Sequence, residues 1–232
     1  VLYDVPKMLL SSYGPLALKW NHMPKMLNWF LHYFKNCNQK SMMHTARNMH
    51  QILSLSNDAY EEIFQEVDTT GLVEKKGIIY IWTNKNLKSR DLEIKVRKEL
   101  GIEQKLLTQK EVLDLEPNLQ PVFDAGVIYE SAMHARDPHG ILKKIFKLYL
   151  DRGGKFIQAN IKNLEQINLN ETAIRSENDE YKFEKTVVAS GAFSKLLTDQ
   201  LGENIPLDTE RGYHVHFKGK DHLIKRPVIF LD

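Results

Sequence analysis

Residues Thr186-Val-Val-Ala-Ser-Gly-Ala-Phe-Ser194 combine an uncharged, β-branched run with a group of small residues. The run predicts a strand covered on both faces of a parallel sheet, and the small residues predict a turn into a helix near 193–201. Small residues let a backbone approach a ligand at the carboxyl edge of such a sheet, where nucleotides bind in open α/β folds. The N–H groups that open the helix favour an anion. The same pattern is also typical of a turn that only permits close packing, so both interpretations stay open.

Strands and helices alternate on the N-terminal side of this stretch. β-Branched, aromatic and apolar runs predict strands at 77–83, 125–130 and 155–161, and a hairpin over 164–176 that turns at Asn170-Glu171. The chain is therefore mixed α/β, without internal repeats.

The ends of the helices carry local signals. Thr108 and Glu111 fit a capping box, which predicts a short helix that ends before Pro117. Asp137 suits the N-cap of the next helix, and Gly153 its end.

The first third of the chain is predicted to be helical. Pro24 suits the first turn of a helix whose apolar residues continue to Phe34, and a second, uninterrupted helix is predicted over about 40–67. The aromatic stripe indicates a helix packed on its own domain. Trp20 and Trp29, with the nearby lysines, are also typical of a helix lying at a membrane surface.

Composition restricts the function classes. The 232 residues are 42% apolar and 27% charged with a net charge of +2, enough for one large domain or two smaller ones. This balance argues against binding to nucleic acid driven by charge. Cys37, the single cysteine, forms no internal disulfide and fits a reducing compartment, so we expect a cytoplasmic protein. No apolar run is long enough for a transmembrane helix, and no Cys/His cluster predicts a metal site.

A second stretch with chemical potential is Glu210-Arg-Gly-Tyr-His214. Arg211 could hold a carboxylate in a bidentate fork, and Tyr213 or His214 could hydrogen-bond one. A surface ion pair followed by ordinary strand residues explains the stretch equally well. Arg136, before an Asp-Pro helix start, is expected to face solvent.

Several motifs that are weakly specific when taken singly become specific through their order and spacing. They are Gly71-Leu-Val, Gly77-Ile-Ile-Tyr-Ile, Leu115-Glu-Pro117, Gly126-Val-Ile-Tyr, Arg136-Asp-Pro138, Gly153-Gly-Lys-Phe, Val187–Ser194 and Pro206–His214. In this order the chain resembles the D-amino-acid oxidase/dehydrogenase superfamily of FAD-dependent enzymes, and within it the small subunit of D-amino-acid dehydrogenases.

The resemblance implies a mixed α/β (α+β) fold, in which a Rossmann-like FAD-binding domain is interleaved with a substrate domain built on an antiparallel sheet. Residues 1–135 would form a helical segment and substrate-domain strands, 136–204 part of the FAD-binding domain, and 205–232 the return into the substrate domain. The family's N-terminal G-x-G-x-x-G unit is absent from this sequence. We therefore expect an internal fragment, short of roughly 60 N-terminal and more than 100 C-terminal residues, that holds FAD poorly and is inactive alone.

The resemblance also implies site residues and a reaction. FAD would be bound by Ile161, Ser190, Gly191 and Ala192, and substrate by Arg211, Tyr213 and His214. The implied reaction is oxidation of the C–N bond of a D-amino acid or related secondary amine by hydride transfer to flavin, without a dedicated side-chain base. The electron acceptor could belong to a respiratory chain, with the protein peripheral on the inner membrane. A flavoprotein acting on a 2-hydroxy acid, and a non-catalytic module that binds a membrane or a partner, remain alternatives.

Overall fold

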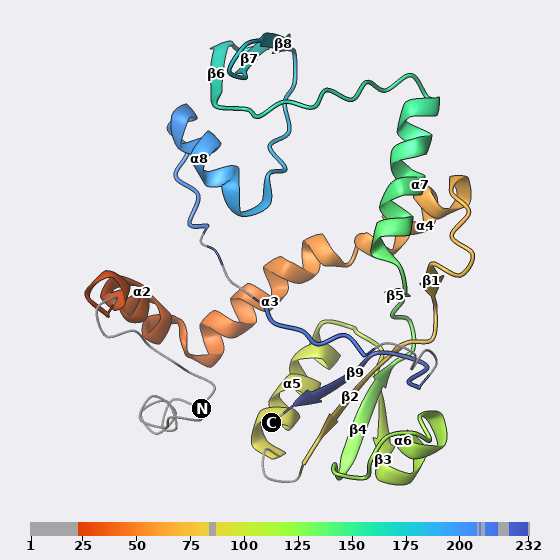
Figure 1. Cartoon of the computed structure of the whole chain (residues 1–232). Helices are drawn as coiled ribbons and strands as arrows, with labels where there is room; N and C mark the ends of the chain where they lie inside the picture. The colour runs from red at the N-terminus through yellow and green to blue at the C-terminus, as the bar shows by residue number, and fades with distance from the viewer. Residues whose placement is uncertain (1–22, 84–86, 208, 210–211, 218–222, 232) are drawn as a thin grey trace. The chain divides into compact units, whose positions relative to one another are not determined.

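The computed structural model describes residues 23–83, 87–207, 209, 212–217 and 223–231 (Figure 1). The chain divides into two compact units. Unit 1 comprises residues 1–144 and 224–232, and unit 2 comprises residues 145–223. Helices and sheets occur together, which confirms the mixed α/β prediction.

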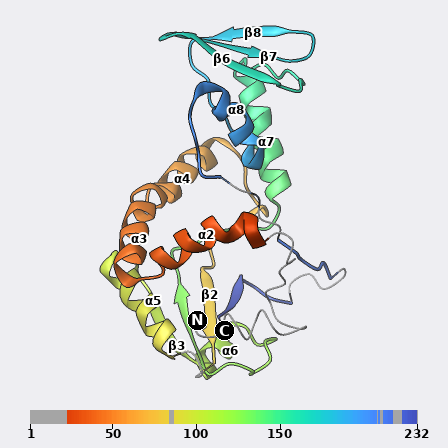
Figure 2. The ribbon, with the colours of Figure 1, turned by 90° about the vertical axis from the view of Figure 1, so that its left-hand side faces the viewer.

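Helices make up the first part of unit 1 (Figure 2). They are α2 (Met23–Asn36), α3 (Gln39–Leu53), α4 (Ser56–Glu66), α5 (Leu87–Glu99), α6 (Gln109–Leu115) and α7 (Pro138–Asp151), the last of which continues into unit 2. Pro24 lies in the first turn of α2, as predicted.

The prediction of one uninterrupted helix over 40–67 was wrong. The chain forms α3 and α4 with a break at Ser54 and Leu55. The Ser56 hydroxyl donates to the carbonyl oxygen of Leu53, so a side chain competes for the backbone groups that would continue the helix.

A four-stranded sheet forms the centre of unit 1, in the order β3-β4-β2-β9. Its strands are β2 (Ile78–Trp82), β3 (Lys105–Thr108), β4 (Ala125–Tyr129) and β9 (Val228–Leu231). β4 pairs antiparallel with β2 and β3, whereas β9 pairs parallel with β2. A small second sheet pairs β1 (Val73–Glu74) with β5 (His134–Ala135). The strands predicted at 77–83 and 125–130 are therefore confirmed.

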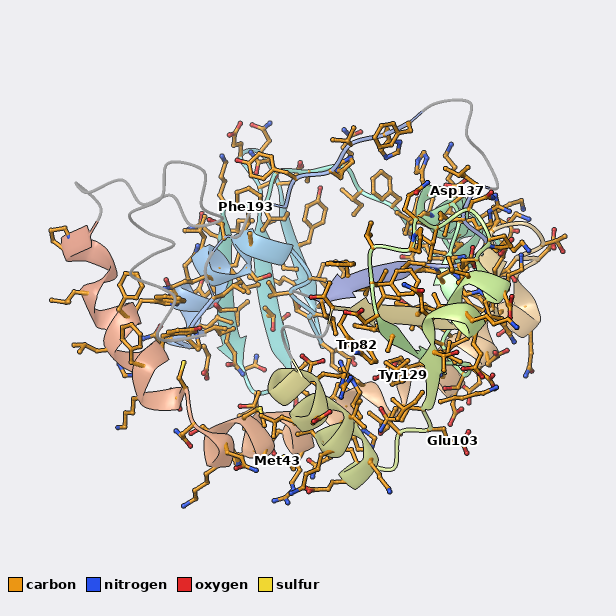
Figure 3. All side chains as sticks on the ribbon, turned by 90° about the horizontal axis from the view of Figure 1, so that it is seen from below. Met43, Trp82, Glu103, Tyr129, Asp137 and Phe193 are labelled. Carbon is orange, nitrogen blue, oxygen red and sulfur yellow. The ribbon has the colours of Figure 1, made fainter. Side chains whose placement is uncertain are left out.

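Alternation along β2 separates two apolar clusters, one on each face of the sheet. Ile79 and Ile81 pack with Val112 of α6 in one buried cluster. Trp82 and Tyr129 belong to the other cluster and lie close together in Figure 3. On that second face, Arg90 and Arg97 of α5 stack over the aromatic rings of β2 and β4. The sheet is thus covered by α6 on one face and by α5 on the other.

Gly126 in β4 allows α6 to pack directly on the sheet. A Cβ atom at this position would lie 2.9 Å from Cγ2 of Val112 and 3.0 Å from the carbonyl oxygen of Tyr80. Only glycine fits without a shift of backbone or helix, which explains its place in a Gly-Val-Ile-Tyr strand.

A buried ion pair fastens the chain that leads into β9. The Glu116 side chain is 1% exposed; it accepts a hydrogen bond from Nε of Arg226 at 2.9 Å and another from the backbone N–H of Lys225 at 2.8 Å. Glu116 follows directly on α6. The Leu-Glu-Pro motif therefore holds together two segments far apart in sequence.

Unit 2 contains a three-stranded antiparallel sheet and short helical turns. The strands β6 (Asn163–Asn168), β7 (Glu171–Arg175) and β8 (Glu180–Phe183) pair in chain order. The helical pieces are η3 (Gly191–Phe193), α8 (Ser194–Thr198) and η4 (Asp199–Leu201). The predicted hairpin is confirmed, but it turns at Leu169 and Asn170, one residue earlier than expected.

Two strands predicted in unit 2 are not formed. Residues 155–161 and 186–190 lie outside every strand, and Val187 is 89% exposed. A strand needs a neighbour to take its backbone hydrogen bonds, and neither segment has one among the described residues. An apolar, β-branched run was therefore not sufficient evidence.

The predicted helix ends are confirmed. Thr108 and Glu111 form the full capping box of α6, and the carboxylate of Asp137 accepts the backbone N–H of Gly140 at the start of α7. Arg136 is exposed, as expected, and its guanidinium also pairs with the carboxylate of Glu74 at 2.9 Å.

Candidate functional site

Residues Ser190, Gly191 and Ala192 form an open turn that leads into α8; we call it the 190–192 turn. Gly191 has a φ of +57°, in the left-handed region, and a Cβ atom at this position would meet no atom within 4 Å. Gly191 and Ala192 are exposed, and Phe193, which follows them, is 71% exposed (Figure 3). Glycine is therefore required here by backbone conformation, and the space beside it is free.

The backbone of the 190–192 turn has hydrogen-bond donors to offer. Within the described part of the chain, the N–H groups of Ser190, Gly191 and Ala192 donate to no acceptor. Oγ1 of Thr186, at the start of the preceding segment, is buried without a partner. The predicted contribution of a helix dipole is small, since α8 is only five residues long. What the turn offers is a row of backbone donors.

Ile161 lies at the end of the 155–161 segment, and Lys162 separates it from β6. It is half-buried, and the N–H of its neighbour Lys162 donates to the carbonyl oxygen of Arg175 at 2.9 Å. Ile161 and the 190–192 turn both belong to unit 2. Among the described residues, no hydrogen bond joins Ile161 directly to the 190–192 turn.

The structure describes two of the three predicted substrate residues, Tyr213 and His214. Arg211 lies outside the described residues. Tyr213 is 87% exposed, and His214 is exposed with its ring 5.1 Å from that of His216. The structure thus does not bring Tyr213 and His214 into an enclosed site.

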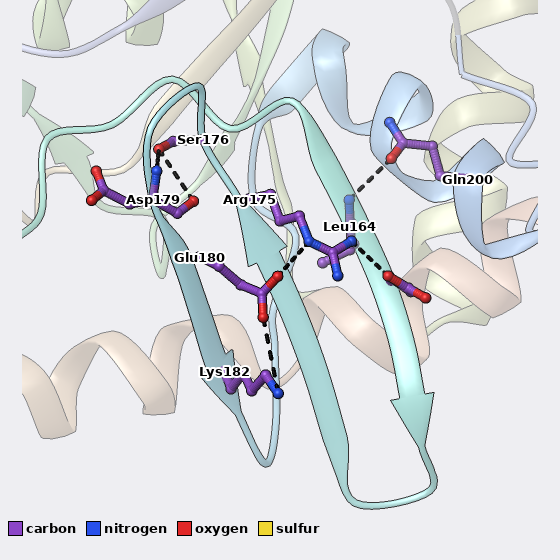
Figure 4. A network of polar contacts seen from close by, with 8 residues as sticks. Leu164, Arg175, Ser176, Asp179, Glu180, Lys182 and Gln200 are labelled. Atoms are coloured by element: carbon purple, nitrogen blue, oxygen red, sulfur yellow. Dashed lines mark hydrogen bonds and ion pairs between the residues drawn. The ribbon is translucent and has the colours of Figure 1, made fainter.

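An ion-pair network stiffens the sheet of unit 2 (Figure 4). The Arg175 guanidinium contacts the carboxylates of Glu165 and Glu180, each at 2.6 Å. Hydrogen bonding to Arg175 holds the pKa of the Glu180 carboxyl below its ordinary value. Glu165 and Glu180 are exposed and Arg175 is only half-buried, so the network orients β6, β7 and β8 rather than forming a reactive site.

Unit 1 contains a separate open hollow of about 650 Å³ beside β2 and β9. Its lining is mostly apolar, with Ile81, Val228 and Phe230, and includes His134. Nδ1 of His134 is buried without a partner, while Nε2 lies 3.8 Å from Glu74. The hollow could accept an apolar group. The sequence did not indicate it, because its lining comes from distant segments.

Neither a metal centre nor a membrane-spanning helix is found in the parts of the chain that the structure describes. No three His, Cys, Asp or Glu side chains there gather closely enough to hold a metal ion. None of the described helices has the length and hydropathy needed to cross a bilayer.

Comparison with known proteins decides the family. Residues 13–231 match the family model described as "DAO: FAD dependent oxidoreductase". The chain belongs to the DAO family of FAD-dependent oxidoreductases. This confirms the resemblance drawn from the motifs.

The similar proteins agree with the family. A D-amino-acid oxidase from Bradyrhizobium diazoefficiens is 31% identical over 91% of this chain and 50% of its own length. A D-amino acid dehydrogenase from Vibrio atlanticus is 24% identical over 89% of this chain and 51% of its own length. The chain therefore spans about half the length of the curated relatives that it matches.

Solved structures show the same fold. Glycine oxidase from Geobacillus kaustophilus matches 72% of this chain and 44% of its own chain with a TM-score of 0.53 at 16% identity. L-Proline dehydrogenase from P. horikoshii matches 65% of this chain and 40% of its own, with a TM-score of 0.54 at 18% identity. At these identities the likeness concerns the fold.

FAD is the cofactor of the DAO family, and the residues of unit 2 fit part of it. The 190–192 turn offers free backbone donors and open space, which suits the polar, phosphate-bearing part of a dinucleotide. The unpartnered hydroxyl of Thr186 adds one more polar group nearby in sequence. No G-x-G-x-x-G occurs in the 232 residues, so they supply only part of a cofactor site.

Proposed function

We propose that this chain forms part of an FAD-dependent enzyme that oxidises the C–N bond of a D-amino acid or a related secondary amine. The observation that carries the proposal is the 31% identity to a D-amino-acid oxidase over 91% of the chain. When bound, FAD would supply the oxidising chemistry for hydride removal from the substrate α-carbon, and water would hydrolyse the imine product.

The chain's own residues would bind and orient. The 190–192 turn would donate backbone N–H groups to the polar part of FAD, and the backbone of Ile161 would face the adenine. Arg211, with Tyr213 and His214, would hold the substrate carboxylate, because a guanidinium fork matches a carboxylate in shape and charge.

A substrate panel tests this proposal. In the full-length protein, D-amino acids or secondary amines should bleach the visible absorbance of bound flavin under anaerobic conditions, and Arg211→Met should raise the substrate concentration that this requires. Bleaching by 2-hydroxy acids but by no amine would overturn the proposal in favour of a 2-hydroxy-acid flavoprotein. The isolated 232-residue chain is proposed to be inactive.

We further propose a cytoplasmic location with peripheral attachment to a membrane, where a respiratory-chain component would accept electrons. The supporting observation is that no Asp or Glu occurs between Asp4 and Asp58, while six Lys and Arg residues do. In α2, Trp29 and Leu31 are exposed. Exposed aromatic residues on a cationic helix favour an anionic lipid surface.

Vesicle co-sedimentation tests the attachment. The protein should sediment with vesicles of anionic lipid at low salt, less at high salt, and little with zwitterionic vesicles. Equal recovery in the supernatant under all three conditions would remove the membrane proposal and leave the oxidoreductase proposal unaffected.

A further inference from the structure

The side chain of Gln200 makes three hydrogen bonds that join two distant segments of unit 2. Its Oε1 accepts from the backbone N–H of Leu164 at 3.0 Å, a contact seen in Figure 4. Its Nε2 donates to the carbonyl oxygens of Lys162 and Leu196, each at 3.0 Å. The acceptor and both donor hydrogens of one amide are thus engaged by backbone alone.

The two segments joined in this way carry the cofactor-binding residues proposed above. Lys162 directly follows Ile161. Leu196 lies in α8, which begins two residues after Ala192. Gln200 therefore bonds to the backbone one residue after Ile161 and to the backbone four residues after Ala192.

The proposed FAD contacts themselves lie outside the strands and α-helices, although Leu164 lies in β6 and Leu196 in α8. Residues 155–161 and 186–190 have no strand partner among the described residues, so no ladder of backbone hydrogen bonds sets their positions. The packing beneath the junction is small: Leu164, Ala173 and Thr198 are its buried residues. With so little core, hydrogen bonds of one side chain have a large share in setting the local geometry.

We propose that Gln200 is a positioning residue for FAD, which sets the 190–192 turn against the backbone at Ile161. This inference rests on the proposed function. Gln200 does not touch the cofactor in this account. It acts by holding two loosely structured segments at the spacing at which both bind the same ligand, so that less order has to be imposed on binding.

The test uses the full-length protein and three variants. Gln200→Leu removes all three hydrogen bonds. Gln200→Glu keeps an acceptor for Leu164 but presents a carboxylate to the carbonyl oxygens of Lys162 and Leu196. Gln166→Leu on β6 is the matched control, because Gln166 is exposed and makes no side-chain hydrogen bond with the described residues.

Three readouts separate positioning from simple stability. Flavin fluorescence titration gives the Kd for FAD, visible circular dichroism reports the geometry of the bound flavin, and hydrogen exchange reports on 160–166 and 186–193. Gln200→Leu should weaken FAD binding about tenfold, alter the flavin dichroism and speed exchange in both segments, as expected from losing several hydrogen bonds. Gln166→Leu should match the wild type in all three.

The outcomes are distinct. A folded Gln200→Leu protein with wild-type Kd and flavin dichroism overturns the inference, even if exchange is faster. If Gln200→Leu does not fold, Gln200→Glu decides. Two facing carbonyl oxygens disfavour its carboxylate and should raise its pKa, and the protonated carboxyl regains one donor, so its affinity relative to wild type should rise from about pH 7 to about pH 5. An affinity ratio that does not change with pH contradicts the inference. Absence of FAD binding in the wild type would instead refute the proposed function.

Discussion

Ile79 in unit 1 and Val187 in unit 2 are both β-branched residues within apolar runs, but the protein uses them differently. Ile79 is 0% exposed and lies in β2 between two paired strands, whereas Val187 is 89% exposed in a segment without a strand partner. Burial comes from the neighbours that a run finds, and the described residues supply strand partners for the run of Ile79 but none for that of Val187. A stable scaffold and an open, proposed ligand-binding surface therefore coexist in one chain.

The largest expected effect concerns the ion pair that closes unit 1. Glu116→Gln should lower the free energy of unfolding of unit 1 by about 3–5 kcal/mol, because it leaves the charge of Arg226 uncompensated in a largely buried position. Denaturant titration measures this change. Glu103→Gln, at an exposed carboxylate, is the matched control and should have little effect. Equal effects of the two changes would show that the pair does not hold β9 in place.

The contrast between the two regions can be measured with one substitution in each. Ile79→Ala should cost about 2–5 kcal/mol of unfolding free energy, because it opens a cavity in the core. Val187→Ala should change it by less than about 0.5 kcal/mol, as expected at an exposed site. A large loss from Val187→Ala would mean that this segment is packed in solution, and would break the comparison.

Close packing of α6 on the sheet predicts a smaller effect. Gly126→Ala should destabilise the protein by about 1–3 kcal/mol, because the added methyl group meets Val112 and the backbone of Tyr80. Gly212→Ala, where a Cβ atom meets nothing within 4 Å, is the control. Thermal unfolding of the two variants would refute the packing argument if both retained the wild-type Tm.

The smallest effect concerns the capping box of α6. Hydrogen bonds from the backbone and hydroxyl of Thr108 hold the pKa of Glu111 below its ordinary value. The folded state therefore prefers the carboxylate, and its contribution to stability is full above the ordinary pKa and is lost as pH falls through the lowered one. Glu111→Gln should make Tm fall less steeply on acidification. An unchanged slope would show that the capping charge does not contribute.

The sequence was a good guide wherever the deciding contacts are local or the strand partners lie within unit 1. Thr108 and Glu111 are three residues apart, and Asp137 caps the helix that it directly precedes. The runs at 77–83 and 125–130 became strands because each finds the other. The run at 186–190 satisfied the same pattern and failed, since pairing is decided by segments that the pattern does not contain.

In the candidate site, too, the sequence predicted local features but not the contacts that the fold creates. Order and spacing of motifs were enough to predict the family, and Gly191 is found in a left-handed conformation beside open space. The roles of Gln200, His134 and Glu116 could not be read from the sequence, because their partners are brought to them by the fold. The proposed contacts of Ile161 and the 190–192 turn with FAD stay predictions.

Hydrogen exchange of the full-length protein with and without FAD tests the central claim most directly. The account predicts that FAD protects peptides covering 155–162 and 186–193, which form no strand pairs among the described residues, and leaves β2 and β4 of unit 1 unchanged. Tight binding of FAD without protection in either segment would contradict the account.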